Sequence, residues 1–416
     1  MKAILHIKII RIEINDMEEA FTLFARTNAR SKDLEVSDLL KNHLFMNWNP
    51  KSNLVLEEEW EEISLNSQNQ LIRMLKYFYV SRNGYITKSK LYKGFKDLSK
   101  DKNVEKLLIN IKNFSEFFDV FMNCDKQKFL QYILSITKKN GTFCVDELQI
   151  ERIRKSIVGI NFFRVTQCYP LIYSFIDAFK SLDLSEDYDR KHKVLLNFFQ
   201  LLENYHFINN FICDRVGNEI EKLYANTCKK FVLAKNKKSF LATYVELFSE
   251  LKKKLAGREE FTERFVQLNY LDDKTSDFMY IFDKIENTNS KKDVSDAYEF
   301  FDTSNPTLRK RYNLEHWLPQ NPAKSHDKKM SFSIHNIGNL LIIPSRTNIR
   351  LGNKLPKEKY NYLSNDEFYS MPHLKKFFSQ FENNFDNWNK EIIDQRAEEL
   401  AKNSYDKVWN FYVPTY

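Results

Sequence analysis

The chain has 416 residues, which is enough for about two or three domains with substantial cores. It holds only 8 Gly and 9 Pro but 35 Phe and 21 Tyr, and this composition favours a helical protein over an all-β one. The formal net charge of +8 agrees with a polyanionic partner, although a lysine-rich composition alone produces the same value. No stretch approaches 18 uncharged apolar residues, so we expect no membrane span.

The start of the chain reads as a strand over residues 3–14 and not as a signal peptide. Charged and polar residues such as His6, Lys8 and Arg11 interrupt the apolar run, and no small-residue cleavage site follows it. The five cysteines are odd in number and widely spaced, and no Cys-x-x-Cys pair occurs. We therefore expect reduced core thiols in a cytoplasmic protein, and no zinc site built from cysteine.

Helical patterns are expected in most of the chain between residues 16 and 255. Residues 16–46 predict a helix pair, and Asn83-Gly84 predicts a turn. Between residues 104 and 255 apolar side chains recur with helical period, and His206 within this stretch is expected to be structural. The lysine clusters between residues 229 and 254 are read as a solvated face, with phosphate contact as the less favoured alternative.

A different pattern occupies residues 314–348. A short apolar strand carries Glu315 and His316 and stops at Pro319, because proline cannot donate to a strand ladder. A second apolar strand follows Asn339, and the residues after Pro344 can open a helix. Between His316 and Asn339 lie 22 residues, which hold a long polar loop. The order is therefore strand, loop, strand and helix around a single histidine.

These residue types suit the hydrolysis of a phosphodiester. A neutral imidazole at His316 can take a proton from water near pH 7. Glu315 and Asn348 offer hard oxygen ligands, which favour Mg²⁺ or Mn²⁺ over Zn²⁺. Asn339 is expected to fix the loop backbone or to orient the imidazole. Adjacent strand residues point to opposite faces, so Glu315 and His316 can serve one site only if the strand is irregular or the ion sits at its edge.

Three runs of residues follow one another in this region: Glu315-His316-x-x-Pro319-Gln320, then Ile337-Gly338-Asn339-Leu340, then Asn348 with Gly352-Asn353-Lys354 and Lys357-x-Lys359. Together they resemble the C-terminal nuclease domain of GmrSD-type restriction proteins. They are also similar to the HNH domain of RNA-guided DNA nucleases. The resemblance implies a small ββα-metal (HNH, or His-Me finger) core with His316 and Asn339 as catalytic residues and Glu315 and Asn348 as metal ligands. Lys354 and Lys359 could then contact phosphates, although solvated lysines are the commoner outcome.

Weaker resemblance extends over the rest of the chain. Residues 16–45 resemble the later part of the GmrSD-type N-terminal domain, and residues 388–409 resemble the closing helix of the family. The Asp-Gly-Gln-Gln-Arg segment that the family uses for nucleotides does not occur in this sequence. We expect a mainly α protein with a truncated GmrSD-type part at 1–98, a helical bundle at 99–295 and an HNH-like nuclease domain at 296–416.

The leading functional hypothesis is a metal-dependent endonuclease of the type IV restriction or phage-defence kind, acting on DNA that carries modifications. One alternative is a non-catalytic nucleic-acid-binding half of a split restriction system. A third is an RNase or toxin-like nuclease, because this chemistry does not distinguish the two sugars. The expected partners are DNA, including modified phage DNA, and either a separately encoded front half or a second copy of the chain, with no membrane.

Overall fold

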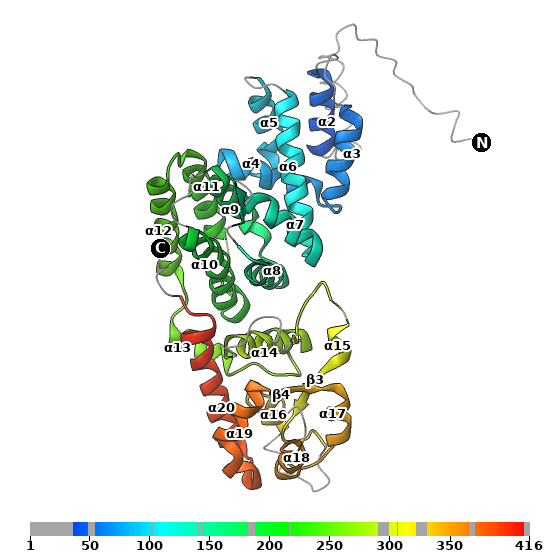
Figure 1. Cartoon of the computed structure of the whole chain (residues 1–416), viewed down its shortest axis with the longest axis vertical. Helices are drawn as coiled ribbons and strands as arrows, with labels where there is room; N and C mark the ends of the chain where they lie inside the picture. The colour runs from blue at the N-terminus through cyan, green and yellow to red at the C-terminus, as the bar shows by residue number, and fades with distance from the viewer. Residues whose placement is uncertain are drawn as a thin grey trace, which may run out of the picture. The chain divides into compact units, whose positions relative to one another are not determined.

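The computed structural model describes residues 36–48, 55–100, 104–139, 142–143, 145–181, 188–216, 218–289, 299–305, 307–321, 331–365 and 371–411. The strand expected at 3–14 and the first helix expected within 16–46 lie outside these residues. The described part is mainly helical, as predicted, and holds two small two-stranded sheets (Figure 1). The chain divides after Asp119 into two compact units, whereas the sequence suggested three domains, and that finer division stays a prediction.

The first unit is a group of helices around an aromatic core. Phe78 on α4 stacks on Phe95 of α5, with ring centroids 6.1 Å apart, and meets Phe114 of α6 edge to face at 5.8 Å. Helix α4 ends at the expected turn, where Gly84 takes a φ of 93° that an L side chain rarely adopts. The helices are α2 (Val36–Met46), α3 (Leu56–Asn66), α4 (Leu71–Asn83), α5 (Leu91–Lys100) and the first part of α6 (Val104–Asn123).

The second unit begins with a helical bundle in which α8 packs on α10 and α9 packs on α11. Phe175 and Phe198 stack face to face at its centre, 3.6 Å apart. His206 is fully buried and contacts the Tyr224 hydroxyl at 2.9 Å, so its place in the bundle is structural. The helices are α7 (Lys126–Thr137), α8 (Glu147–Phe162), α9 (Tyr169–Ser181), α10 (Tyr188–His206), α11 (Asn218–Leu233) and α12 (Lys237–Lys254), with a short hairpin of β1 (Lys138–Lys139) and β2 (Thr142–Phe143).

The same unit continues into a smaller region built around one hairpin. Strands β3 (Tyr312–His316) and β4 (Leu340–Pro344) pair antiparallel, with His316 opposite Leu340, and α17 (Ser345–Leu351) follows directly (Figure 1). Every residue of β4 is buried, which explains its unbroken apolar sequence. The surrounding helices are α13 (Arg258–Phe265), α14 (Thr275–Asn289), α15 (Leu308–Arg311), α16 (Ser331–Ile334), α18 (Pro356–Leu363), α19 (Pro372–Phe381) and α20 (Lys390–Asn403).

Helix α20 packs closely on the turn that enters β4. A side chain at Gly338 would put its Cβ only 2.1 Å from the carbonyl oxygen of Ile393, so this position needs glycine. From α20 the buried Arg396 donates to the carbonyls of Gly338 (2.5 Å) and Leu340 (2.9 Å). The sequence singled out residues 388–409 as a closing helix, and the contacts of Arg396 show what anchors α20.

None of the helices in the described residues combines the length and the apolar character needed to cross a bilayer. The four cysteines within these residues, Cys124, Cys168, Cys213 and Cys228, are free and buried, as the sequence predicted. Burial raises the pKa of each of these thiols, which makes them packing residues and not reactive ones.

Candidate active site

His316 ends β3 and is half-buried among aromatic rings. Its ring lies edge to face with Tyr270 at 5.0 Å and with His335 at 5.3 Å, and the Gln320 side-chain nitrogen is 3.1 Å from its Nε2. Among the described residues no carboxylate contacts the ring. Burial, followed by the nearby His335 and Lys359, lowers the pKa of His316 to about 4, so the imidazole is neutral at pH 7.

Glu315 points to the other face of the strand. Its carboxylate is buried and forms an ion pair with Lys359 of α18, whose side chain is 1% exposed. Burial raises the pKa of Glu315 and lowers the pKa of Lys359, while the opposite charge of the partner acts against each shift. The strand is regular here, so Glu315 and His316 lie on opposite faces, as strand alternation requires.

Asn339 is fully buried and joins three segments through its side-chain amide. The amide oxygen accepts from Leu318 N (2.8 Å) and Trp388 Nε1 (3.0 Å), and the amide nitrogen donates to Leu318 O (3.0 Å) and Ile334 O (2.8 Å). Its own carbonyl accepts from Trp317 N at 2.8 Å, one residue after His316. Asn339 thus fixes the backbone that leaves β3, and of the two roles expected for it the structure favours this one.

Asn348 lies on α17 and faces β3. Its side-chain nitrogen donates to the Leu314 carbonyl at 3.2 Å, so its amide oxygen is the atom that could take an ion. Among the described residues no hydrogen bond joins Asn348 to Glu315 or His316. The two proposed oxygen ligands are therefore held near the same strand by different contacts, one by Leu314 and the other by Lys359.

The two lysines expected to meet phosphates differ from each other. Lys354 is exposed and donates to the Arg350 carbonyl at 2.9 Å, which gives a partner to one of the last carbonyls of α17. Lys359 is not on the surface, which corrects the expectation of a solvated or phosphate-facing side chain. Besides its ion pair, it donates to the carbonyls of His316 (2.6 Å) and Trp317 (3.2 Å). Glu315, the residue before the end of β3, explains this burial better than a phosphate does.

Two neighbours of His316, His335 and Tyr270, were not singled out from the sequence, whereas Gln320 belongs to the motif itself. For His335, a second histidine two residues before the Ile337 turn was a usable signal. Tyr270 carried no such signal, because it lies 46 positions before His316 in the chain. It is placed by backbone pairing, in which Tyr270 N donates to His335 O at 2.8 Å. The Nδ1 atom of His335 is buried with no partner among the described residues.

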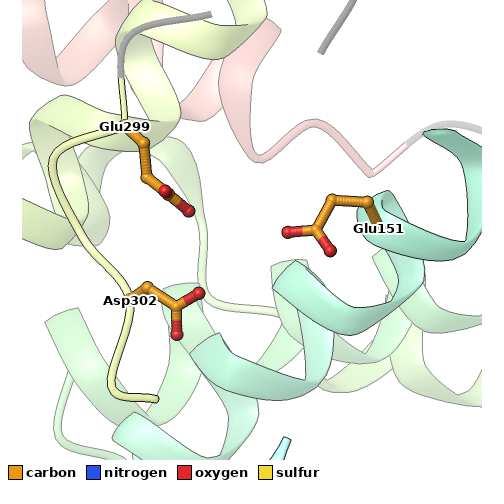
Figure 2. A group of neighbouring side chains, drawn as sticks. All are labelled: Glu151, Glu299 and Asp302. Carbon is orange, nitrogen blue, oxygen red and sulfur yellow. The ribbon is translucent and has the colours of Figure 1, made fainter. Parts of the chain in front are cut away.

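A separate acidic group lies where α8 meets residues 299–305. Glu151, Glu299 and Asp302 bring one carboxylate oxygen each to within 4.8 Å of one another, as Figure 2 shows. Two cations neutralise most of this charge, because Arg154 pairs with Glu151 and Asp302, and Lys155 pairs with Glu299. We interpret the group as an internal ion-pair network that fastens residues 299–305 to α8.

A comparison with known protein families finds a match over the region that holds the candidate site. Residues 256–403 match the family described as GmrSD restriction endonucleases, C-terminal domain. The match spans α13 to the end of α20 and contains every residue of the candidate site, which confirms the resemblance for this part of the chain. No curated protein matches the chain. The resemblance of residues 16–45 to the N-terminal domain of the family stays a prediction.

Proposed function

We propose that this chain is a metal-dependent endonuclease of the HNH kind that hydrolyses DNA phosphodiesters, with His316 as the general base. The observation that carries the proposal is the position of His316, neutral and accessible at the end of β3, inside a region that matches a restriction endonuclease domain. A neutral imidazole free of a carboxylate partner can accept the proton of an attacking water.

The surrounding residues fix the backbone at His316 and place a polar side chain against its ring. Lys359 and Asn339 hold the peptide groups on either side of the strand end, through the contacts to the His316 carbonyl and to Trp317 N. Gln320 lies against the ring and can orient it or the incoming water. A phosphate anion bound beside the ring would raise the pKa of His316 and make it a stronger base than it is in the free protein.

Two oxygen atoms fit a hard divalent ion. Among the described residues the Asn348 amide oxygen accepts no hydrogen bond, and Glu315 keeps a second carboxylate oxygen beyond the one that meets Lys359. We therefore assign the two residues as ligands for Mg²⁺ or Mn²⁺, completed by water and substrate oxygens. The bound ion would neutralise charge on the leaving oxygen. Because Glu315 is also paired with Lys359, we expect the ion to be held weakly.

DNA with modified bases or backbone is the substrate that we propose, since the matched family is one of restriction endonucleases. A role in phage defence and a location in the cytoplasm belong to the same proposal. Lys354, exposed at the end of α17, is our candidate for contact with a phosphate near the site. The contacts of the described residues favour neither the non-catalytic subunit nor the RNase as an alternative. The following experiment separates both of them from the DNA endonuclease.

The experiment incubates the purified full chain with plasmid, modified phage DNA and RNA, with Mg²⁺ or with EDTA. We expect cutting of DNA that needs the metal and that falls at least about 100-fold in His316→Ala. The matched control is His43→Ala, which replaces a histidine of α2 in the first unit and should leave the nuclease activity of the chain unchanged. Cutting of RNA alone would favour the RNase reading, and DNA binding without cutting would favour the non-catalytic subunit.

A further inference from the structure

A cavity of about 420 Å³ opens between α14, α19, α20 and the π-helical segment η10 (Ser404–Val408). It is not lined by His316, Glu315 or Asn348, so it is distinct from the candidate active site. Its apolar wall includes Phe282, Phe381 and Leu400. The volume lies in the range of small-molecule sites, which are mostly apolar with a few placed polar groups.

One buried cation lines this cavity, and none of the described carboxylates forms an ion pair with it. Arg396 is only 5% exposed. Its guanidinium donates hydrogen bonds to backbone carbonyls, including those of Gly338 and Leu340. Its guanidinium also lies over the Phe377 ring, 4.6 Å from the centroid. Burial lowers the pKa of Arg396 to about 9, and the negative charge of Glu399 opposes this shift only in part. A buried cation that meets only neutral acceptors leaves positive potential in the cavity beside it.

Two lysines add to this charge. Lys376 and Lys407 both line the cavity and are close enough that burial, and then the charge of Lys407, lower the pKa of Lys376. The acidic residues of the lining compensate only in part. Glu399 attracts Lys376, but Asp406 is paired with Arg258, which lies outside the lining. Two repelling ammonium groups favour a ligand with more than one negative charge.

The polar end of the cavity also holds an unused donor. The side-chain nitrogen of Asn403 is buried with no acceptor among the described residues, and Asn403 belongs to the lining. It stands where α20 passes into the π-helical segment, and the Oγ of Ser404 beside it is equally without a partner there. Single π turns of this kind occur often at functional sites.

We propose that this cavity binds an organic phosphate, in which a phosphate monoester meets Lys376, Lys407 and the Asn403 amide while a flat apolar group lies against the aromatic wall. A phosphate monoester carries nearly two negative charges and several acceptor oxygens. The charges can pair with both lysines, and one oxygen can accept a hydrogen bond from the Asn403 amide. The positive potential of Arg396 adds to this attraction. The proposal does not depend on nuclease activity, because its residues are outside the candidate active site.

Calorimetry with the full chain tests the proposal, using a purine nucleoside monophosphate, the neutral nucleoside and inorganic phosphate as probes. We expect the monophosphate to bind once per chain and at least about tenfold more tightly than either of the other two, since each supplies only half of the contacts. Lys376→Glu and Lys407→Glu should each weaken binding about tenfold, because each reverses a charge near the phosphate. Lys375→Glu, an exposed neighbour on α19 that does not line the cavity, should leave binding unchanged.

Three outcomes would overturn the proposal. These are no binding of the monophosphate at millimolar concentration, equal binding by wild type and Lys376→Glu, or inorganic phosphate binding as tightly as the monophosphate. Both lysines reach the surface, although Lys376 is partly covered by its neighbours, so thermal unfolding of each variant should match wild type and shows that lost binding is not lost folding. Repeating the titration with His316→Ala keeps the result separate from the nuclease proposal.

Discussion

Lys359 of α18 meets Glu315 of β3 in an ion pair that is almost fully buried, and the same ammonium donates to the carbonyl of His316 at 2.6 Å. One side chain thus connects the Glu315 carboxylate with the backbone of His316, whose imidazole lies on the opposite face of the strand. A lysine in this position is both a structural anchor and a competitor for any ion at Glu315.

Replacing Lys359 by Met should destabilise the fold by about 3 kcal/mol, because it leaves the Glu315 carboxylate buried without its counter-charge. The pKa of Glu315 is already raised by burial, so in the variant this carboxyl should be protonated at a higher pH still. Chemical denaturation at pH 7 measures the loss, and the double variant Glu315→Gln with Lys359→Met should recover part of it.

The matched control is Lys357→Met on the same helix. Lys357 is 42% exposed and its pair with Asp386 spans 3.3 Å at the surface, so the variant should change stability by less than about 0.5 kcal/mol. A Lys359→Met variant as stable as Lys357→Met would show that the buried pair contributes nothing and that Glu315 finds another partner.

Asn339→Ala should lower both stability and cutting. The variant removes the two acceptor and two donor contacts of a fully buried amide, so we expect a loss of about 2–4 kcal/mol in the free energy of unfolding. If Asn339 acts only by fixing the backbone, activity measured at a temperature where the variant is folded should fall through a lower kcat, with the metal dependence unchanged. A variant with full activity when folded would remove Asn339 from the site.

Much of the site region could be predicted because its pattern is local. Pro344 marks the end of β4, whereas β3 ends at His316, three residues before Pro319. The apolar run between Asn339 and Pro344 is a strand with two covered faces. The opposite orientation of Glu315 and His316 also followed from strand alternation. These features depend on neighbours within one or two positions, which a single sequence displays directly.

The environment of these residues could not be predicted, because it depends on contacts between distant segments. Tyr270 reaches His316 only through the backbone pairing of residues 269–270 with 335–336. Lys359 looked like one of several surface lysines, and its burial results from how α18 packs against the end of β3. The requirement for glycine at 338 similarly depends on α20, whose Ile393 carbonyl approaches it from 55 positions away.

The metal assignment predicts a change in metal dependence and not only in rate. Glu315→Gln and Asn348→Ala each remove or weaken one oxygen ligand, so each should raise the Mg²⁺ concentration at half-maximal cutting, by roughly tenfold. Substituting Mn²⁺, which accepts the same ligands, should restore part of the activity. Asn353→Ala, an exposed residue two positions beyond the end of α17, serves as the control. An unchanged metal dependence in both ligand variants would show that the ion binds elsewhere.

The last prediction concerns the response of stability to acid, and it depends on His206 in the helical bundle. His206 is fully buried, and burial lowers its pKa from 6.5 to about 4 in spite of its hydrogen bond to Asn210. Below pH 6.5 the unfolded chain therefore binds a proton at this residue that the folded chain does not. The stabilisation is fully present above pH 6.5 and is lost as the pH falls to 4, by about 3 kcal/mol in total.

His316 shifts in the same direction and adds to this loss, so the measurement compares His316→Ala with and without His206→Gln. The free energy of unfolding, taken from denaturant titrations at pH 7, 5.5 and 4.5, should fall steeply with acid in the first protein and less steeply in the second. Since His206→Gln could itself unfold the bundle, an NMR titration of the His206 ring in the wild-type chain gives a direct reading. A ring that titrates near pH 6.5 would contradict the predicted cause, and acid sensitivity would then have to come from the carboxylates.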